Sequence, residues 1–138
     1  MADKKDIIYE IKHLKKSFGK VEVLKDISMS IENGEVCTII GPSGSGKSTF
    51  LRCLNLLEKP TGGELWFEGK KVNARDTREL CALRQQVGMI FQDFNLLDTF
   101  TLRDNIYLPL VLAGRPYREL KARLDPIARQ LGILELLD

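Results

Sequence analysis

The chain has 138 residues, with 21 lysines and arginines against 19 aspartates and glutamates, so its formal net charge is +2. Apolar residues make up 43% and charged residues 29%, an ordinary globular composition that excludes a disordered or fibrous chain. The nearly balanced charge gives no reason to expect a nucleic-acid partner, and the longest apolar runs are far shorter than the roughly 20 residues of a membrane-spanning helix.

Three strands are predicted in the first 40 residues. Apolar and polar residues alternate in Ile7–Leu14 and again in Val21–Ile31, which is typical of strands buried on one face. A tight turn is predicted over residues 32–35, where Glu, Asn, Gly and Glu follow one another. The continuous apolar run Val36–Ile40 predicts a strand that is covered on both faces.

A helix and a fourth strand are predicted next. Phe50, Leu54 and Leu57 have the spacing of one helical face, and the residues Pro60–Gly63 would end that helix. The apolar segment Leu65–Glu68, which precedes a glycine, predicts a strand.

Asp76 and Glu79 resemble a capping box that opens another helix. The apolar run Val87–Phe91 predicts a second buried strand, and residues 92–100 have no period and predict a loop.

The last part of the chain is predicted to be helical. Thr101 with Asp104 is a further cap signature, and Pro109 is expected to interrupt the helix that it opens. A final helix is predicted from Pro116, with a kink or a restart at Pro126. The order of elements therefore predicts one α/β domain.

A phosphate-loop pattern follows the predicted strand Val36–Ile40. Residues 41–48 match GxxxxGK[ST], and Thr49 comes directly after them. These residues are Gly41, Pro42, Ser43, Gly44, Ser45, Gly46, Lys47, Ser48 and Thr49. Glycines let successive backbone N–H groups converge on phosphate oxygens, and the following helix points its positive end at the same anion. Lys47 would reach the β- and γ-phosphates, and the Ser48 hydroxyl would ligate Mg²⁺. A Gly/Ser-rich turn is the alternative, but the flanking strand and helix favour a nucleoside triphosphate site.

The neighbouring segments resemble the ATP-binding subunit of ABC transporters, over almost the whole chain from Ile8 onward. Residues 14–19, Leu-Lys-Lys-Ser-Phe-Gly, resemble the adenine-stacking segment of that family, which implies that Phe18 lies against adenine. Residues 87–94 resemble its strand and glutamine loop. This resemblance implies that Gln92 contacts Mg²⁺ and the attacking water, so Lys47 and Gln92 are the candidate catalytic residues.

The resemblance implies the P-loop NTPase fold of the ABC ATPase type, an α/β fold incomplete at the C-terminus. About residues 1–91 would form an antiparallel β subdomain and the P-loop core. About residues 92–138 would form the glutamine loop and the start of the helical subdomain. The implied cofactors are ATP and Mg²⁺, and the implied partners are membrane-spanning transporter subunits and a second ATP-binding subunit. The chain would lie on the cytoplasmic side of the cell membrane, and its three cysteines, without CxxC spacing, are typical of reduced thiols.

The two halves of the chain resemble different subfamilies. Residues 48–58 resemble importers of polar amino acids, whereas residues 93–99 and 108–114 resemble ATPases that export antimicrobial peptides or lipoproteins. A polar amino-acid importer is the first expectation and an exporter ATPase is the alternative. A small P-loop kinase or GTPase, or a truncated gene fragment without function, are alternatives from other classes.

Two parts of the family's ATPase machinery are absent from the sequence. It contains no Leu-Ser-Gly-Gly-Gln signature, and no apolar strand that ends in Asp-Glu. Hydrolysis in this class needs a residue that orients water and a partner that closes over the phosphates. The 138-residue chain is therefore expected to bind Mg-ATP weakly and not to turn it over.

Overall fold

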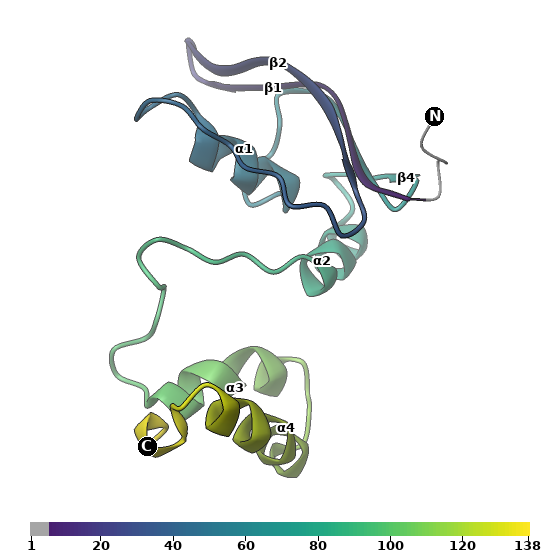
Figure 1. The fold of residues 1–138 in the computed structure, drawn as a ribbon. Coiled ribbons are helices and arrows are strands. Elements are labelled where there is room, and N and C mark those ends of the chain that lie inside the picture. The colour runs from purple at the N-terminus through teal and green to yellow at the C-terminus, as the bar shows by residue number, and fades with distance from the viewer. Residues whose placement is uncertain (1–5) are drawn as a thin grey trace. The chain divides into compact units, whose positions relative to one another are not determined.

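The computed structural model describes residues 6–138, so residues 1–5 of the predicted first subdomain lie outside it. The chain divides into two compact units, one ending at Met89 and the other comprising Ile90–Asp138. In the first unit, a sheet curves over a helix, and the second unit is built from helices (Figure 1). The helices and sheet confirm the predicted α/β class.

The sheet of the first unit is antiparallel throughout its described strands. They are β1 (Ile7–Phe18), β2 (Val21–Glu32), β3 (Gly62–Phe67) and β4 (Lys70–Lys71), in the order β2-β1-β3-β4. β1 and β2 form a long hairpin (Figure 1), so the two alternating segments of the sequence are confirmed as strands, each longer than predicted.

A bulge in β1 decides which residues of its second half face the core. The pairing of β1 with β2 shifts between Ile11 and Leu14, and its pairing with β3 shifts between Lys12 and Lys15. His13, which lies in both intervals, has a left-handed φ of 51°. Tyr9 and Ile11 are buried before the bulge, and Leu14 and Lys16 are buried after it. One extra residue in a strand moves the following side chains to the opposite face. The buried face of β1 therefore continues through even-numbered residues toward Phe18.

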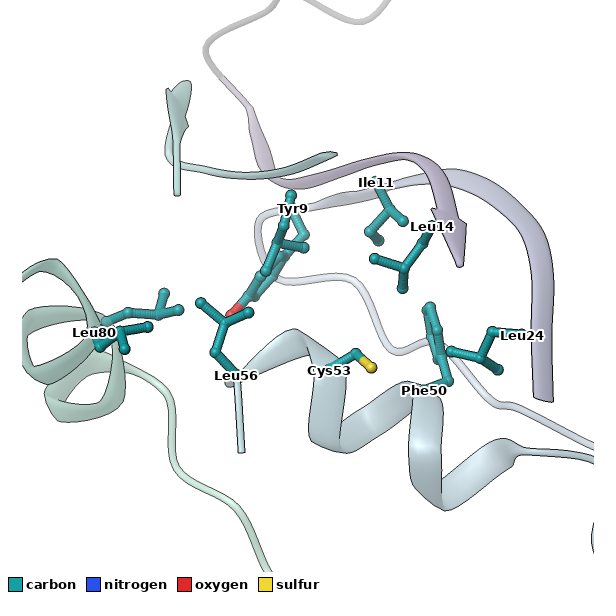
Figure 2. Packing of buried hydrophobic residues seen from close by; sticks show 10 residues of the cluster. Tyr9, Ile11, Leu14, Leu24, Phe50, Cys53, Leu56 and Leu80 are labelled. Carbon is teal, nitrogen blue, oxygen red and sulfur yellow. The ribbon is translucent and has the colours of Figure 1, made fainter. Parts of the chain in front are cut away.

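The core of the first unit lies between this sheet and helices α1 (Lys47–Leu54) and α2 (Thr77–Gln86). Leu14 and Leu24 from the strands point toward Phe50 of α1 (Figure 2). The Tyr9 hydroxyl donates a hydrogen bond of 3.1 Å to the Leu54 carbonyl at the end of α1. Burial raises the pKa of Tyr9 to about 12.

Helix α1 ends earlier than the sequence predicts. It stops at Leu54, and Leu57 is exposed instead of extending the buried face. Leu56 is buried through a left-handed conformation, with φ 56°. The guanidinium of Arg84 in α2 donates to the carbonyls of Asn55 and Leu56 at 3.3 and 2.7 Å, which satisfies backbone groups that a longer helix would have paired.

The two predicted buried strands are wrong. Val36–Ile40 and Val87–Phe91 form no strand in the structure. Val36, Ile40 and Ile90 are 91%, 89% and 98% exposed. An apolar run becomes a buried strand only where other strands pair with its edges, and no ladder joins either run to another part of residues 6–138.

The predicted N-terminal cap of α2 is confirmed, but its reciprocal half is not. The Asp76 carboxylate accepts hydrogen bonds from the backbone N–H groups of Arg78 and Glu79 at 2.8 and 3.3 Å. The Glu79 carboxylate accepts from the N–H of Asn73 instead of the N–H of Asp76. Glu79 therefore ties the preceding loop to the helix.

The second unit is a helical pair. It contains α3 (Leu102–Leu112), α4 (Tyr117–Gln130) and a short 3₁₀ helix, η1 (Leu134–Leu136). Pro109 lies inside α3, so the predicted interruption there is wrong, and α4 continues through Pro126. The core of the second unit contains five buried side chains, those of Tyr107, Leu120, Leu124, Ala128 and Leu137.

Two polar contacts fix the N-terminal end of α3. The Thr101 hydroxyl accepts a hydrogen bond from the Asp104 N–H at 3.1 Å, which confirms the predicted cap. The Arg103 guanidinium lies 2.7 Å from the Asp138 carboxylate and holds the pKa of that carboxyl below its usual range.

Candidate functional site

The predicted phosphate loop is an exposed turn that leads directly into α1. The Ser45 N–H donates to the Pro42 carbonyl at 3.3 Å, which closes the turn. Gly44 and Gly46 have left-handed φ values of 79° and 95°, a conformation that residues with a Cβ rarely adopt. Gly44 and Gly46 therefore occupy positions that require glycine, whereas Gly41 has no left-handed φ.

Gly46 also holds the loop close to the sheet. A Cβ built on it would lie 3.0 Å from Val23 Cγ1, 3.1 Å from Leu24 Cδ2 and 3.3 Å from the Val23 carbonyl oxygen. At Gly44 a Cβ would meet no atom within 4 Å. β2 thus supports the end of the loop at which α1 begins, whereas the middle of the loop is open.

The N-terminus of α1 presents unpaired backbone donors. Its first residues are Lys47, Ser48 and Thr49, and its cap residue Gly46 has no side chain that could accept from their N–H groups. These N–H groups, together with the helix dipole, attract an anion. The same turn carries the exposed Ser48 side chain and no acidic residue.

The Lys47 ammonium lies across the loop. Nζ donates to the carbonyls of Gly41 and Pro42, both at 2.7 Å, and lies 3.4 Å from Ser45 Oγ. Among the ion pairs of residues 6–138, none neutralises Lys47. Neutral carbonyls leave the formal charge of the ammonium unneutralised, so it still attracts a phosphate.

These groups fit a triphosphate bound with Mg²⁺. Within the described residues there is no group of three or more His, Cys, Asp or Glu side chains that could hold a metal by themselves. A P-loop does not need such a group, because a Ser or Thr hydroxyl and the phosphate oxygens supply most ligands of the ion. Ser48 has the position for this role.

Phe18 ends β1 at the tip of the β1–β2 hairpin, and its side chain is 46% exposed. It pairs with Val21, two residues before the Val23 that packs against Gly46. The tip of the hairpin and the start of α1 lie at the same end of the first unit (Figure 1). The structure therefore places the exposed Phe18 at the end of the first unit at which the phosphate loop lies.

Gln92 belongs to the second unit, where it is exposed in a turn at residues 92–93. Its predicted contact with the Mg²⁺ site stays a prediction.

Sequence reasoning gave no role to Lys16 and Glu58. Lys16 is 8% exposed although it is a lysine on a strand, and its Nζ lies 3.0 Å from the Glu58 carboxylate. Nζ also lies 4.6 Å from the centroid of the Phe18 ring. The spacing of Lys16 and Phe18, two residues apart in a strand, was the only signal in the sequence that could have placed them on one face.

No helix of residues 6–138 is both long and apolar enough to span a membrane.

The sequence comparisons find a matching family and similar proteins. A family model described as ABC transporter matches residues 24–138. Methionine import ATP-binding protein MetN 1 of Bacillus cereus is 46% identical over 133 residues, which are 94% of this chain and 38% of the relative. Methionine import ATP-binding protein MetN of Mesorhizobium japonicum is 45% identical over 122 residues, 88% of this chain and 33% of the relative. The chain thus spans well under half the length of these relatives.

Two solved structures of ABC transporter proteins are similar to this chain. CbiO1 from Clostridium perfringens, part of the ABC transporter complex cbiONQ, matches with a TM-score of 0.80 and 29% identity, over 96% of this chain and 53% of that one. The bacterial ABC transporter cassette MJ0796, solved as a dimer, matches with a TM-score of 0.75 and 36% identity, over 84% of this chain and 53% of that one.

Proposed function

The chain belongs to the ABC transporter family, and we propose that it binds ATP with Mg²⁺ as the energy-coupling part of an importer. The observation that carries this proposal is the loop Gly41–Thr49. Its left-handed glycines, the free N–H groups of α1 and the Lys47 ammonium converge on one exposed turn. Because the chain belongs to this family, a small P-loop kinase or GTPase is no longer an alternative.

Each residue of the proposed site has one task. The N–H groups of the loop and of α1 bind phosphate oxygens, and the Lys47 ammonium moves from the loop carbonyls onto the β- and γ-phosphates. The Ser48 hydroxyl would ligate Mg²⁺, which neutralises charge on the phosphates. Phe18 would stack on adenine, and the family resemblance of residues 87–94 assigns Gln92 the contact with the ion and the attacking water. About residues 1–91 serve as β subdomain and P-loop core, and about residues 92–138 carry the glutamine loop.

We propose methionine as the transported substrate. The polar amino acids expected from residues 48–58 are the broader class, but the relatives described above carry names of methionine importers. The partners would be membrane-spanning subunits at the inner face of the membrane and a second ATP-binding subunit, since MJ0796 forms a dimer. Disruption of the coding region in the source organism should reduce the uptake of labelled methionine and leave the uptake of glutamine unchanged. Equal loss of both, or of neither, contradicts this substrate.

Equilibrium dialysis with ATP and Mg²⁺ tests the nucleotide site. Lys47→Ala should weaken ATP binding about 10- to 100-fold, because hydrogen bonds to charged groups contribute roughly 1.5–3 kcal/mol. Lys25→Ala is the matched control, since Lys25 is an exposed lysine on β2. Equal affinities of the two variants would contradict the assignment of Lys47.

A further inference from the structure

Lys16 is a buried cation whose position is fixed by two groups. Its ammonium donates a hydrogen bond of 2.8 Å to the Lys59 carbonyl and lies 3.0 Å from the Glu58 carboxylate. Its side chain is 10% exposed and that of Glu58 is 31% exposed. A buried ammonium persists only where such partners compensate for lost hydration. The ammonium therefore has one defined place in the first unit.

The same ammonium lies against the ring of Phe18. Nζ is 4.6 Å from the ring centroid, within the distance at which a cation is attracted by an aromatic face. Lys16 and Phe18 are two residues apart in β1, and the ammonium lies over the Phe18 ring, so the two side chains stand on one face of the strand. Phe18 remains 46% exposed, so a large part of its side chain is accessible while the cation engages the ring.

We propose that Lys16 is a positioning residue for the nucleotide base, because its fixed ammonium holds the Phe18 ring in the orientation in which adenine stacks on it. This inference rests on the proposed function, which takes Phe18 as the base contact. Lys16 does not touch the nucleotide itself. It acts by ordering an exposed ring before binding, so that less conformational freedom is lost when the base arrives.

The anchor of Lys16 also relates the two parts of the nucleotide site. Glu58 and Lys59 follow α1, and α1 begins at the phosphate loop. Phe18 stands on β1, at the tip of the hairpin whose other strand packs on Gly46. The Lys16 contacts thus connect the segment after the phosphate-binding helix to the base-binding ring.

Two ligands separate a role at the base from a role at the phosphates. ATP and inorganic tripolyphosphate, each with Mg²⁺, are titrated into the 138-residue chain by calorimetry. Lys16→Met, which keeps the apolar stem, should weaken ATP binding about three- to tenfold, in the range of one cation–π contact. It should leave tripolyphosphate binding unchanged. Lys16→Arg should retain the ATP affinity, since a guanidinium is also charged and stacks on aromatic rings.

Lys12 provides a matched control on the same strand. Its Nζ lies 4.8 Å from the centroid of the Trp66 ring, so Lys12→Met removes a similar contact away from Phe18. This variant should bind both ligands like the wild type. In a double-mutant cycle, Lys16→Met should cause no further loss of ATP affinity in a Phe18→Ala background, because Lys16 acts through the ring.

The titrations distinguish failure of the positioning role from failure of the proposed function. Unchanged ATP binding by Lys16→Met, or equal weakening of ATP and tripolyphosphate, overturns the positioning role while the phosphate site stands. If the wild type binds neither ligand, the proposed function fails and the inference falls with it. If circular dichroism shows that Lys16→Met is unfolded, Lys16→Gln replaces it, since its side chain is uncharged but polar. That variant should also lose affinity for ATP and not for tripolyphosphate. If it shows no such selective loss, the positioning role of Lys16 is refuted.

Discussion

The close approach of the phosphate loop to β2 predicts that Gly46→Ala is the most damaging substitution in the loop. A left-handed φ of 95° is one cost of a Cβ at this position, roughly 1–2 kcal/mol. Contacts of 3.0 and 3.1 Å with the side chains of Val23 and Leu24, and of 3.3 Å with a backbone oxygen, add roughly 1–2 kcal/mol of overpacking. The expected loss in free energy of unfolding is therefore about 2–4 kcal/mol.

Gly44→Ala is the matched control for this substitution. Gly44 also has a left-handed φ, 79°, but a Cβ there would meet no atom within 4 Å. Only the conformational cost applies, so the expected loss is about 1–2 kcal/mol. The difference between the two variants isolates the contribution of the packing against β2.

Urea unfolding followed by tryptophan fluorescence measures both variants. Trp66, the only tryptophan, lies in β3 and so reports on the first unit. With a slope of about 1.5 kcal/mol/M, Gly46→Ala should lower the urea midpoint by about 2 M and Gly44→Ala by about 1 M. Equal midpoints, or a lower midpoint for Gly44→Ala, would refute the argument that β2 supports the loop.

Three further predictions concern the fold. Gly63→Ala should abolish the cooperative thermal transition of the sheet in circular dichroism, because its Cβ would lie 2.2 Å from the His13 carbonyl oxygen; a cooperative transition near the wild-type temperature contradicts this. Since burial raises the pKa of Tyr9 to about 12 from an ordinary value of 10.0, the folded state holds this proton more tightly. The resulting stability is complete below pH 10 and falls by roughly 2–3 kcal/mol as the pH rises through 12, so alkaline unfolding should show this decline in the wild type and lack it in Tyr9→Phe. Leu120→Ala should cost about 2–5 kcal/mol in the second unit, and Leu112→Ala, at an exposed site, less than about 0.5 kcal/mol, as measured by amide hydrogen exchange of α4.

The sequence predicts those parts of the fold that depend only on residues close together along the chain. The alternation in β1 and β2, and the caps at Asp76 and Thr101, are local patterns, and the structure contains all of them. The phosphate loop is also local, because its glycines define which backbone conformations it can adopt.

Contacts between distant segments are not predictable in this way. Val36–Ile40 is apolar enough for a buried strand, but a strand exists only where a partner pairs with it, and composition does not identify partners. The early end of α1 follows from Arg84, which binds the carbonyls beyond Leu54 from another helix. Lys16 is buried because Glu58 is near it in space, and no pattern within β1 indicates that contact.

The β1–β2 hairpin fixes both halves of the proposed nucleotide site. Its second strand packs on Gly46 at the start of the phosphate-binding helix, and its first strand ends in Phe18, the proposed base contact. The two strands pair up to the tip, where Phe18 lies opposite Val21. A displacement of one strand is therefore transmitted to the other through the shared ladder. It follows that the distance between the phosphate loop and the base platform is set by the pairing of the hairpin, so substitutions that weaken this pairing should reduce affinity for ATP more than affinity for tripolyphosphate.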